Sequence, residues 1–572
     1  MNLQGRGRLW PLMLLTAVLA LVVACMGAEG ENATPTDGPG AVQRIDGGDM
    51  VVQGNEPDSL DPHWSAFQPD ISLERMLWRG LYSLDENQEV QPSMAAAMPV
   101  ISADGTTYTI TLRDGLMWSD GDDLTAEDFV LGIERTCNPD NAGQYQFALT
   151  SIVGCDDYAY AAEPTDEEEA DLRAAVGVTA LDETTVEITL ANPQPTFPII
   201  LSLWMTFPVP AHLLTEPGED WPTGPDAPGG LAFNGPYLLT EYVPQDHATL
   251  APNPNWAAPS GVSPTLDSLT VQFIDDIASA NNAYRTDELQ FALADTTVLS
   301  ALVSEFGEGD EYFKSVKPGT RGLQMNLGRE PLDNVDVRLA LSQAIDRQAI
   351  VEVVANGAHQ ATTSWIPGFV PAGAAPDAFD ACCGFDPDAA RQHLADAGFP
   401  DGEGFPEGLS LLIGETPEAQ DTAAFLQDAF KTHLSIDIEI EVVDGATRAD
   451  RFYSIDYDLF IGGWVQDYHD PETWVAGLFE TGSFINFTNC SNEEIDQLIA
   501  DNLSNADNEA RLAAYARVNE LIVTTVCGIA PFWHENSHYL IKPNVVGMSE
   551  NANAQDAIQA GDWLAEAWGF SE

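Results

Sequence analysis

The segment Ile461-Gly-Gly-Trp-Val-Gln-Asp-Tyr-His-Asp-Pro471 combines the end of an apolar run with two glycines, an aromatic residue and an acid. The run that leads into it, Tyr457–Ile461, is aromatic and apolar enough to predict a buried strand that breaks at the glycines. Glycine has no Cβ and lets another chain approach the backbone closely. Trp464 adds a flat apolar surface, and Asp467 adds a carboxylate. This pattern suits an extended ligand with a positively charged amino end, although a glycine-rich turn with a core tryptophan and a solvated aspartate would also fit.

The composition excludes one large class of function. The 572 residues include 22 Lys and Arg but 90 Asp and Glu, which gives a formal net charge of −68. Nucleic-acid binding requires a basic surface, so the chain is not predicted to bind nucleic acid. The charge is interpreted as adaptation to a saline environment, or alternatively as attraction for cationic ligands. A chain of this length can bury a large core and is expected to divide into more than one lobe.

The N-terminus is typical of a bacterial lipoprotein signal. Two arginines precede the mostly apolar run Leu9–Ala20, and Val22-Val-Ala-Cys25 looks like a lipobox. Residues 1–24 are therefore predicted to be a signal peptide, with Cys25 as the lipidated residue. The alternative is an uncleaved membrane anchor, for which the apolar run is short. Residues 25–45 show no apolar period and are predicted to be a disordered tether.

The other cysteines are interpreted as structural. An exported chain can oxidise its thiols, and two pairs are candidates for disulfides, Cys137 with Cys155 and Cys490 with Cys527. Cys382 and Cys383 could form a vicinal bridge, pair elsewhere or stay reduced. There is no Cys-x-x-Cys, and the nine histidines do not cluster at ligand spacing. Asp120, Asp122 and Asp123 lack the spacing of a calcium loop, so neither a metal site nor a cofactor is predicted.

A second stretch carries a longer and more specific pattern. Thr106–Leu112 alternates as a strand, and Arg-Asp-Gly-Leu-Met-Trp-Ser-Asp-Gly follows at residues 113–121. Thr125 and Asp128 then form a capping box that opens a helix. This order is similar to the signature of the family 5 extracytoplasmic solute-binding proteins of ABC importers. The segment around Asp467 resembles the corresponding part of the family's oligopeptide-binding proteins.

Further segments resemble the family in the same collinear order. Met50–Gln53 predicts a strand, and Leu60-Asp-Pro62 after it is similar to the start of the family's chains. Phe233–Leu239 resembles the family's Asn-Gly-x-Tyr turn and strand. Asp333–Gly357 predicts one long helix, with Asp336 as its cap and a glycine as its stop. Together these segments cover nearly all of the chain that follows the predicted tether.

The resemblance implies an α/β protein with the two-lobed periplasmic-binding-protein fold, type II and cluster C-like. Two segments would cross between the lobes, and the ligand would lie in a cleft that closes by a hinge motion. The first lobe is expected to carry an extra subdomain. The expected bounds are 46–73, 206–316 and 536–572 for the first lobe, 74–205 for its extra subdomain, and 317–535 for the second lobe.

The resemblance also implies a ligand site. Asp467 would bind the α-ammonium group of a peptide, which agrees with the high cost of burying an unpaired charge. The peptide would be held by strand-like backbone hydrogen bonds. The other residues that the resemblance places at the cleft are Gly462, Gly463, Trp464, Glu56, Asp58, Tyr145, Trp533 and His534.

The chain also departs from the family pattern. Val465 and Gln466 stand where enteric oligopeptide-binding proteins often have Cys-Ala, so that family disulfide cannot form. The crossing region Gly319–Gln324 is too dissimilar for any transfer of residue roles. No basic residue is identified for the C-terminus of a peptide, which leaves the length of the peptide open.

The predicted function is that of a lipid-anchored, extracytoplasmic and monomeric receptor. It would capture an oligopeptide or a dipeptide and deliver it to the permease subunits of an ABC transporter. The same fold could instead bind an oligosaccharide, nickel or another solute, since Trp464, Trp474 and Trp533 would also stack on sugars. Asp467 favours a peptide, because a neutral sugar gains nothing specific from that charge. A secreted hydrolase is the least favoured function, and no enzyme is predicted, because the chain has neither Gly-x-Ser-x-Gly nor His-Glu-x-x-His.

Overall fold

The computed structural model describes residues 44–85, 88–141, 143–162, 164–213, 231–259, 261–548 and 564–571. The predicted signal peptide, the lipidation residue Cys25 and most of the predicted tether lie outside the described residues. Among the residues that are described, no helix is both long enough and apolar enough to cross a membrane.

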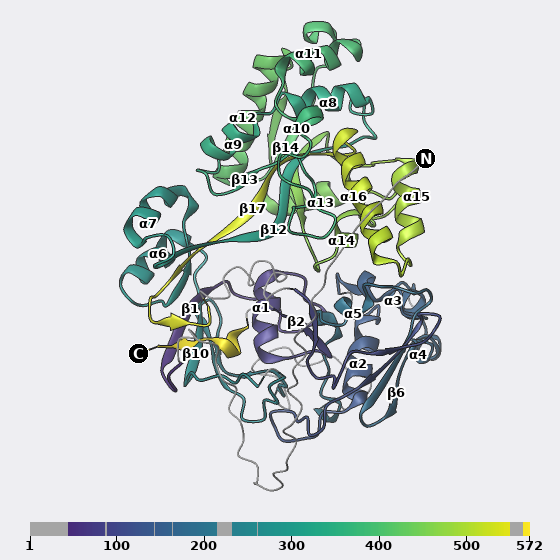
Figure 1. Ribbon diagram of the computed structural model, residues 1–572, viewed down its shortest axis with the longest axis vertical. Coiled ribbons are helices and arrows are strands. Elements are labelled where there is room, and N and C mark those ends of the chain that lie inside the picture. The colour runs from purple at the N-terminus through teal and green to yellow at the C-terminus, as the bar shows by residue number, and fades with distance from the viewer. Residues whose placement is uncertain are drawn as a thin grey trace, which may run out of the picture. The chain divides into compact units, whose positions relative to one another are not determined.

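The largest element is an 11-stranded sheet. Its order is β15 (Glu439–Val442), β14 (Ser410–Ile413), β16 (Leu459–Val465), β12 (Tyr312–Met325), β17 (Ile529–Ile541), β11 (Phe291–Leu293), β1 (Asp49–Gly54), β10 (Ser268–Phe273), β9 (His247–Pro252) and β8 (Tyr237–Val243), with β13 (Gln360–Ala361) paired to β17. The long strands β12 and β17 run antiparallel and side by side (Figure 1). Because β16 pairs with β12 and β11 pairs with β17, these two strands connect the two halves of the sheet.

The ladder between β12 and β17 is irregular near its middle. The register shifts between Val316 and Thr320, and again between Arg321 and Gly322. Pro318 lies in the first interruption, where its missing N–H could not have joined the ladder. Glu535 of β17 binds Lys317 Nζ, inside this interruption, at 3.3 Å and Arg321 Nε, beyond it, at 2.8 Å.

A separate four-stranded sheet has the order β4 (Val100–Ile101), β5 (Thr107–Thr111), β7 (Thr185–Thr189) and β6 (Val178–Asp182). Next to β6 and β7 lies α2 (Ala126–Thr136), which buries Phe129 and Ile133. Both halves of the predicted capping box are present, and Asp128 Oδ2 accepts a hydrogen bond from the Thr125 N–H at 2.7 Å. The predicted strand and helix start in this stretch are therefore confirmed.

The remaining elements complete the two halves. The helices are α1 (Gln68–Leu77), α3 (Cys155–Ala159), α4 (Asp166–Ala174), α5 (Phe197–Ile200), α6 (Ile277–Arg285), α7 (Leu299–Phe306), α8 (Val335–Gln343), α9 (Arg347–Val353), α10 (Asp380–Cys383), α11 (Pro387–Asp396), α12 (Pro417–Leu434), α13 (Gly445–Tyr453), α14 (Glu472–Val475), α15 (Glu493–Asn502) and α16 (Asn508–Thr524). Short strand pairs are β2 (Tyr82–Leu84) with β3 (Val90–Pro92) and β18 (Val545–Val546) with β19 (Gly569–Phe570). The acid-rich composition supplies many caps, for example Asp444 at α13 and Asp507 at α16.

Three large hydrophobic cores hold these elements together. The first contains Trp78, Trp118 and Trp204 with the N-terminal strands and α2. The second is built around β12, β14 and β16 with α8, α9 and α12. The third includes Trp365 and Trp474 with α15 and α16. Burial of apolar surface on this scale is the main source of stability for such a chain.

The prediction of one long helix over Asp333–Gly357 is wrong. The segment forms α8 and α9, separated at residues 344–346. Asn334, rather than Asp336, caps α8 by accepting a hydrogen bond from the Asp336 N–H. Asp346 interrupts the run because its side chain accepts a hydrogen bond from the Ala349 N–H and so begins a second helix. A local side-chain cap therefore outweighs the apolar periodicity.

The predicted strand end at the two glycines is also wrong, because β16 continues through both of them to Val465. Gly463 pairs with Arg321 of β12, and Gly462 pairs with Gly322. A Cβ on Gly463 would overlap the carbonyl oxygen of Thr320. The chain that approaches this backbone closely is thus the neighbouring strand of the same sheet.

Three cysteine pairs are joined in the structure. Two of them are the candidate pairs, Cys137 with Cys155 and Cys490 with Cys527. The third is the vicinal pair Cys382–Cys383 in α10, one of the three possibilities left open by the sequence. Cys137 follows α2 and is joined to Cys155 at the start of α3, whereas Cys490 and Cys527 both lie in loops, the second between α16 and β17.

Candidate ligand-binding site

Asp467 is a buried carboxylate that follows β16 and faces residues from a distant part of the chain. Its Oδ1 accepts a hydrogen bond from the Tyr145 hydroxyl at 2.9 Å, and its Oδ2 accepts one from Thr473 Oγ1 at 2.6 Å. The residue is 9% exposed. Within the described part of the chain, no lysine, arginine or histidine forms an ion pair with it. The site therefore holds an acid that has hydrogen-bond donors but no cation.

This environment changes the protonation of both partners. Burial raises the pKa of Asp467 to about 6, although the hydrogen bonds from Thr473 and Tyr145 act to lower it. Burial, together with the charge of Asp467, holds the pKa of Tyr145 well above its usual value. Tyr145 thus remains a proton donor at neutral pH, and a neighbouring cation would stabilise the ionised form of Asp467.

The loop that carries Asp467 is held in place by a buried ion pair between Arg511 and Asp470. Both guanidinium nitrogens of Arg511 bind Asp470, at 2.8 and 2.5 Å, and Asp470 also accepts a hydrogen bond from the Glu472 N–H. Glu472 in turn accepts a hydrogen bond from Thr196 Oγ1 at 3.1 Å. Burial, and secondly Asp470, raises the pKa of Glu472 to about 7. The loop between β16 and α14 therefore contacts residues of both halves of the fold.

Trp464 lines a cavity of about 600 Å³ beside this loop. Tyr145 and Gly463 line the same cavity, so the hydroxyl that binds Asp467 belongs to a ring on the cavity wall. Trp464 packs against the third core, whereas Tyr145 packs against the first. The cavity is thus lined from both halves of the fold. Its volume lies in the range of small-ligand sites.

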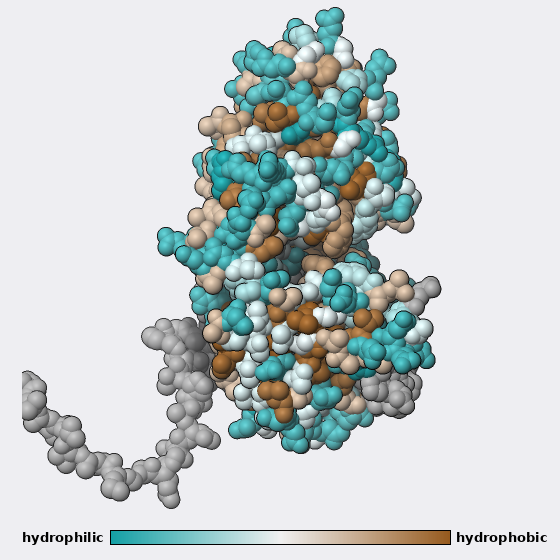
Figure 2. All heavy atoms as spheres, turned by 90° about the vertical axis from the view of Figure 1, so that its right-hand side faces the viewer, coloured by the Kyte–Doolittle hydropathy of each residue, from teal (hydrophilic) through white to brown (hydrophobic). Residues whose placement is uncertain are grey.

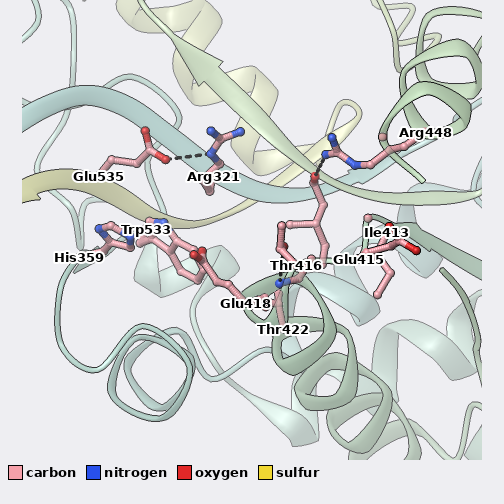
Figure 3. Close-up of a pocket in the computed structure, with 14 residues that line it drawn as sticks. Arg321, His359, Ile413, Glu415, Thr416, Glu418, Thr422, Arg448, Trp533 and Glu535 are labelled. Carbon is pink, nitrogen blue, oxygen red and sulfur yellow. Dashed lines mark hydrogen bonds and ion pairs between the residues drawn. The ribbon is translucent and has the colours of Figure 1, made fainter. Parts of the chain in front are cut away.

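A second cavity of about 690 Å³ is lined by charged side chains (Figure 3). Arg321 comes from β12 and binds Glu535, while Arg448 comes from α13 and donates a hydrogen bond to the Ile461 carbonyl at 3.3 Å. The pKa of Glu535 falls to about 2, because Lys317 and Arg321 outweigh the opposite effect of burial. Arg448 forms no ion pair with any described residue, and its guanidinium lies 4.5 Å from the ring centre of Phe460. It is a cation with spare donors.

The two cavities follow one another along the same elements. Ile461 lines the charged cavity, and Gly463, on the same face of β16, lines the aromatic one. Along α13, Arg448 faces the first and Tyr453 faces the second. Arg448 lines the charged cavity, whereas Asp467 lines neither cavity and contacts the aromatic one through the Tyr145 hydroxyl.

The structure separates several of the predicted site residues from the two cavities. Glu56 accepts hydrogen bonds from Gln245 N–H at 3.0 Å and from the Tyr242 hydroxyl, at the turn between β8 and β9. The Asp58 N–H donates to Asp70 at 2.7 Å. Neither Glu56 nor Asp58 is among the residues that line the two cavities.

Three more predicted residues lie along the sheet. His534 is buried between the hydroxyls of Thr320 and Thr362, and burial lowers its pKa to about 3, so it supports the strands. Trp533 lines the charged cavity and stacks on His359, with ring centres 5.3 Å apart. Gly462 faces the side chain of Gln324. Of the predicted residues, Trp464, Gly463 and Tyr145 line the aromatic cavity, and Asp467 contacts it through the Tyr145 hydroxyl.

The residues that sequence reasoning missed are mainly Arg321, Arg448 and Thr473. Arg321 lies in the segment that was too dissimilar for a transfer of roles. Arg448 follows the cap of a short helix, where an arginine usually indicates a solvated face. The one available signal was the scarcity of basic residues, since the whole chain has only 22 Lys and Arg.

A separate exposed group consists of Asp120, Asp122 and His212, whose potential ligand atoms all lie within 4.8 Å of one another. His212 Nε2 is 2.6 Å from Asp120 Oδ2 and so already has a partner. Exposed acidic groups are common on a chain of this charge, and this group is not interpreted as a metal centre.

Comparison with known proteins gives consistent matches over nearly the whole chain. Residues 89–485 match the model of the bacterial extracellular solute-binding proteins, family 5 middle region. The periplasmic oligopeptide-binding protein OppA of Salmonella typhimurium is 27% identical, over 90% of this chain and 92% of its own length. The periplasmic murein peptide-binding protein MppA of Escherichia coli is 28% identical, over 88% and 90% respectively.

Solved structures show the same fold. The unliganded open form of the murein tripeptide-binding protein MppA superposes with a TM-score of 0.74 at 24% identity, covering 93% of this chain and 99% of that one. This likeness confirms the predicted two-lobed α/β fold. In this chain, β12 and β17 are the paired strands that join the two halves of the sheet.

Proposed function

Because the chain belongs to the family 5 bacterial extracellular solute-binding proteins, we propose that it captures peptides between its lobes for delivery to an ABC transporter. Members of this family are binding proteins, so the prediction that the chain is not an enzyme is confirmed. The relatives OppA and MppA are named for the oligopeptides and murein peptides that they bind. The observation that carries the proposal for this chain is the buried, cation-free carboxylate of Asp467.

The α-ammonium group of a peptide is the proposed partner of Asp467. A buried carboxylate without a counter-charge is costly, and an ammonium group offers both the charge and three N–H donors. Charge-assisted hydrogen bonds of this kind are stronger than neutral ones. Tyr145 and Thr473 already orient the two carboxylate oxygens, so the acceptor is held in place before the ligand arrives.

The carboxylate of the peptide is proposed to bind at the charged cavity. Arg448 has spare donors there, and Arg321 lies in the same lining. Guanidinium groups bind carboxylates through paired N–H donors. A zwitterionic peptide would then pair its ammonium group with Asp467 and its carboxylate with Arg448. This assignment supplies the basic residue that the sequence did not identify.

Anchoring and delivery are further parts of the proposal. Cys25, after its lipobox-like segment, would carry the lipid that holds the protein at the outer face of the membrane. The protein is proposed to act as a monomer that meets the permease subunits when its cleft is closed. The predicted lobe boundaries belong to the same proposal.

Thermal unfolding of residues 44–572 tests the peptide claim. A ligand that binds only the folded state at ~100 times its Kd stabilises that state by roughly 2.7 kcal/mol, a readily visible shift in Tm. We expect mixed short peptides to raise the Tm, and the same peptides with acetylated N-termini to lose most of that effect. Asp467→Asn should abolish the shift, whereas Glu56→Gln, an acid away from the cavities, should retain it.

The same thermal-unfolding experiment is repeated with oligosaccharides as the alternative ligands. A Tm shift with sugars and none with free peptides would overturn peptide capture and leave the fold assignment intact. An equal shift with free and acetylated peptides would overturn the role of Asp467 alone.

A further inference from the structure

The cavity beside Asp467 has a lining unlike the rest of this acidic chain. Its lining residues include no Asp, Glu, Lys or Arg, and its polar members are amides, hydroxyls and two indoles. The neighbouring charged cavity, by contrast, is lined by Arg321, Arg448, Glu415, Glu418 and Glu535. Hydrophilic residues cover most of the face shown in Figure 2. The two cavities thus have opposite chemistry.

Aromatic rings form two facing walls of this cavity. On one side, Tyr145 and Phe147 have ring centres 5.4 Å apart. On the other, Phe487 lies 4.5 Å from Phe452 and 5.6 Å from Tyr453. The first wall comes from the segment between α2 and α3, and the second from α13 and the loop before α15. Such walls can hold a flat or bulky apolar group by edge-to-face and offset contacts.

Several aromatic rings of this cavity are exposed. Phe484 is 71% exposed, Tyr453 is 65% exposed and Phe67 is 50% exposed, and all three line this one cavity. Single exposed apolar residues are ordinary, but a group of large aromatic residues around one cavity indicates a binding surface. Covering them with an apolar group removes their surface from water.

Two polar atoms in the lining also lack partners. Gln324 is 8% exposed, and its Oε1 has no hydrogen-bond partner among the described residues. The Trp464 Nε1–H is likewise buried without a described partner. An acceptor and a donor of this kind match the N–H and C=O groups of a peptide backbone. Their presence points to a peptide-like occupant for an otherwise apolar cavity.

The position of the cavity identifies which part of a peptide would fill it. The Tyr145 hydroxyl binds Asp467 while its ring lines the cavity, so an ammonium group at Asp467 would lie at the edge of the aromatic walls. We infer that this cavity selects peptides with a bulky aromatic or aliphatic side chain at their first or second residue. The inference rests on the proposed peptide function, and it adds a substrate class to it.

The experiment measures Kd by calorimetry for three tripeptides: an all-alanine peptide, and the same peptide with phenylalanine at the first or the second position. The wild-type protein should bind at least one phenylalanine peptide about tenfold or more tightly than the alanine peptide, because burial of a large side chain is worth ~1.5–3 kcal/mol. Tyr453→Ser combined with Phe484→Ser removes two exposed rings with little cost to folding. This double variant should reduce the preference to about threefold or less while its Kd for the alanine peptide changes little.

Tyr160→Ser combined with Phe385→Ser is the matched control, because both residues are exposed aromatics that line neither cavity. It should keep the wild-type preference. Equal Kd values of wild type for all three tripeptides would overturn the inference and leave peptide capture standing. A preference that survives in the Tyr453/Phe484 variant would also overturn it. If no tripeptide or longer peptide binds at all, the proposed function fails and the inference fails with it.

Discussion

The Tyr145 hydroxyl donates a hydrogen bond to Asp467 Oδ1 across 2.9 Å, although 322 residues separate the two in the sequence. One partner packs with the first core and the other follows a strand of the second. This hydrogen bond therefore depends both on the association of the two halves of the fold and on the protonation state of Asp467.

Tyr145→Phe should raise the pKa of Asp467 further. The hydrogen bond from Tyr145 stabilises the ionised carboxylate, so its loss favours the protonated form. The side-chain carboxyl resonance of Asp467, followed by NMR over a pH titration, gives the measurement. Phe147→Leu changes the same wall without touching the acid and should leave this pKa in place. An unchanged pKa in Tyr145→Phe would show that the contact does not form in solution.

Peptide affinity should depend on pH through Asp467. Its pKa is raised from 3.8 to about 6 in the free protein, and an ammonium ligand binds the ionised form. Affinity should therefore be constant above pH ~7 and fall by up to roughly tenfold per pH unit as the pH drops below 6. Calorimetric titrations between pH 4.5 and 8 test this, and N-acetylated peptides serve as the comparison because they should lack the dependence.

The same group has the opposite effect on the stability of the free protein. Its folded-state pKa lies above the unfolded value, so between pH ~4 and ~6 the folded state binds more protons than the unfolded state. Stability should therefore fall as pH rises through this window. Asp467→Asn should remove that component, so its stability relative to wild type should increase with pH. The pKa of Glu472 is raised to about 7, so this residue adds a further decrease in stability at higher pH. The Glu472→Gln variant would isolate that contribution.

Gly463→Ala should destabilise the protein by about 1–3 kcal/mol or more. The added Cβ would overlap the Thr320 carbonyl, which belongs to the paired strand and cannot move without disturbing the ladder. Chemical denaturation measures the change. Gly445→Ala is a suitable control, because a Cβ there meets nothing within 4 Å and the residue lies at the start of α13. A tolerated Gly463→Ala would contradict the register given for β16.

Arg448→Gln should weaken the binding of peptides with a free C-terminus by about tenfold or more, since hydrogen bonds to charged groups contribute ~1.5–3 kcal/mol. C-terminally amidated peptides should bind wild type and variant alike. Arg517→Gln removes an exposed arginine far along the chain and serves as the charge control. Loss of affinity for both kinds of peptide would indicate a general disturbance of the cavity.

The fold could be predicted from the sequence because its signals are local and repeated. The alternation at Thr106–Leu112 and the Thr125–Asp128 capping box each depend on residues a few positions apart. The break between α8 and α9 was missed since the cap formed by Asp346 competes with an apolar pattern that continues through it. The course of β16 was missed for a different reason, because only the pairing with β12 shows what the two glycines accommodate.

The site was predicted in part. Asp467 and Trp464 were found from a single segment, but the donor that faces Asp467 is on the other side of the fold. The scarcity of basic residues was the one sequence signal for Arg448, because its proposed role depends on the cavity that α13 forms with β16. Glu56 and His534 remain predicted cleft residues, and in this structure each forms hydrogen bonds with residues far away in the sequence.

The interruption of the β12–β17 ladder has a mechanical consequence. A change in the angle between the two halves of the sheet breaks the fewest backbone hydrogen bonds where the register already shifts, at residues 316–320. Glu535 links this segment to the residue that follows it, because it binds Lys317 within the interruption and Arg321 after it. An anion that binds Arg321 competes with Glu535 for the same guanidinium group. Arg321 therefore links binding in the charged cavity to the rigidity of the strands that join the two halves of the sheet.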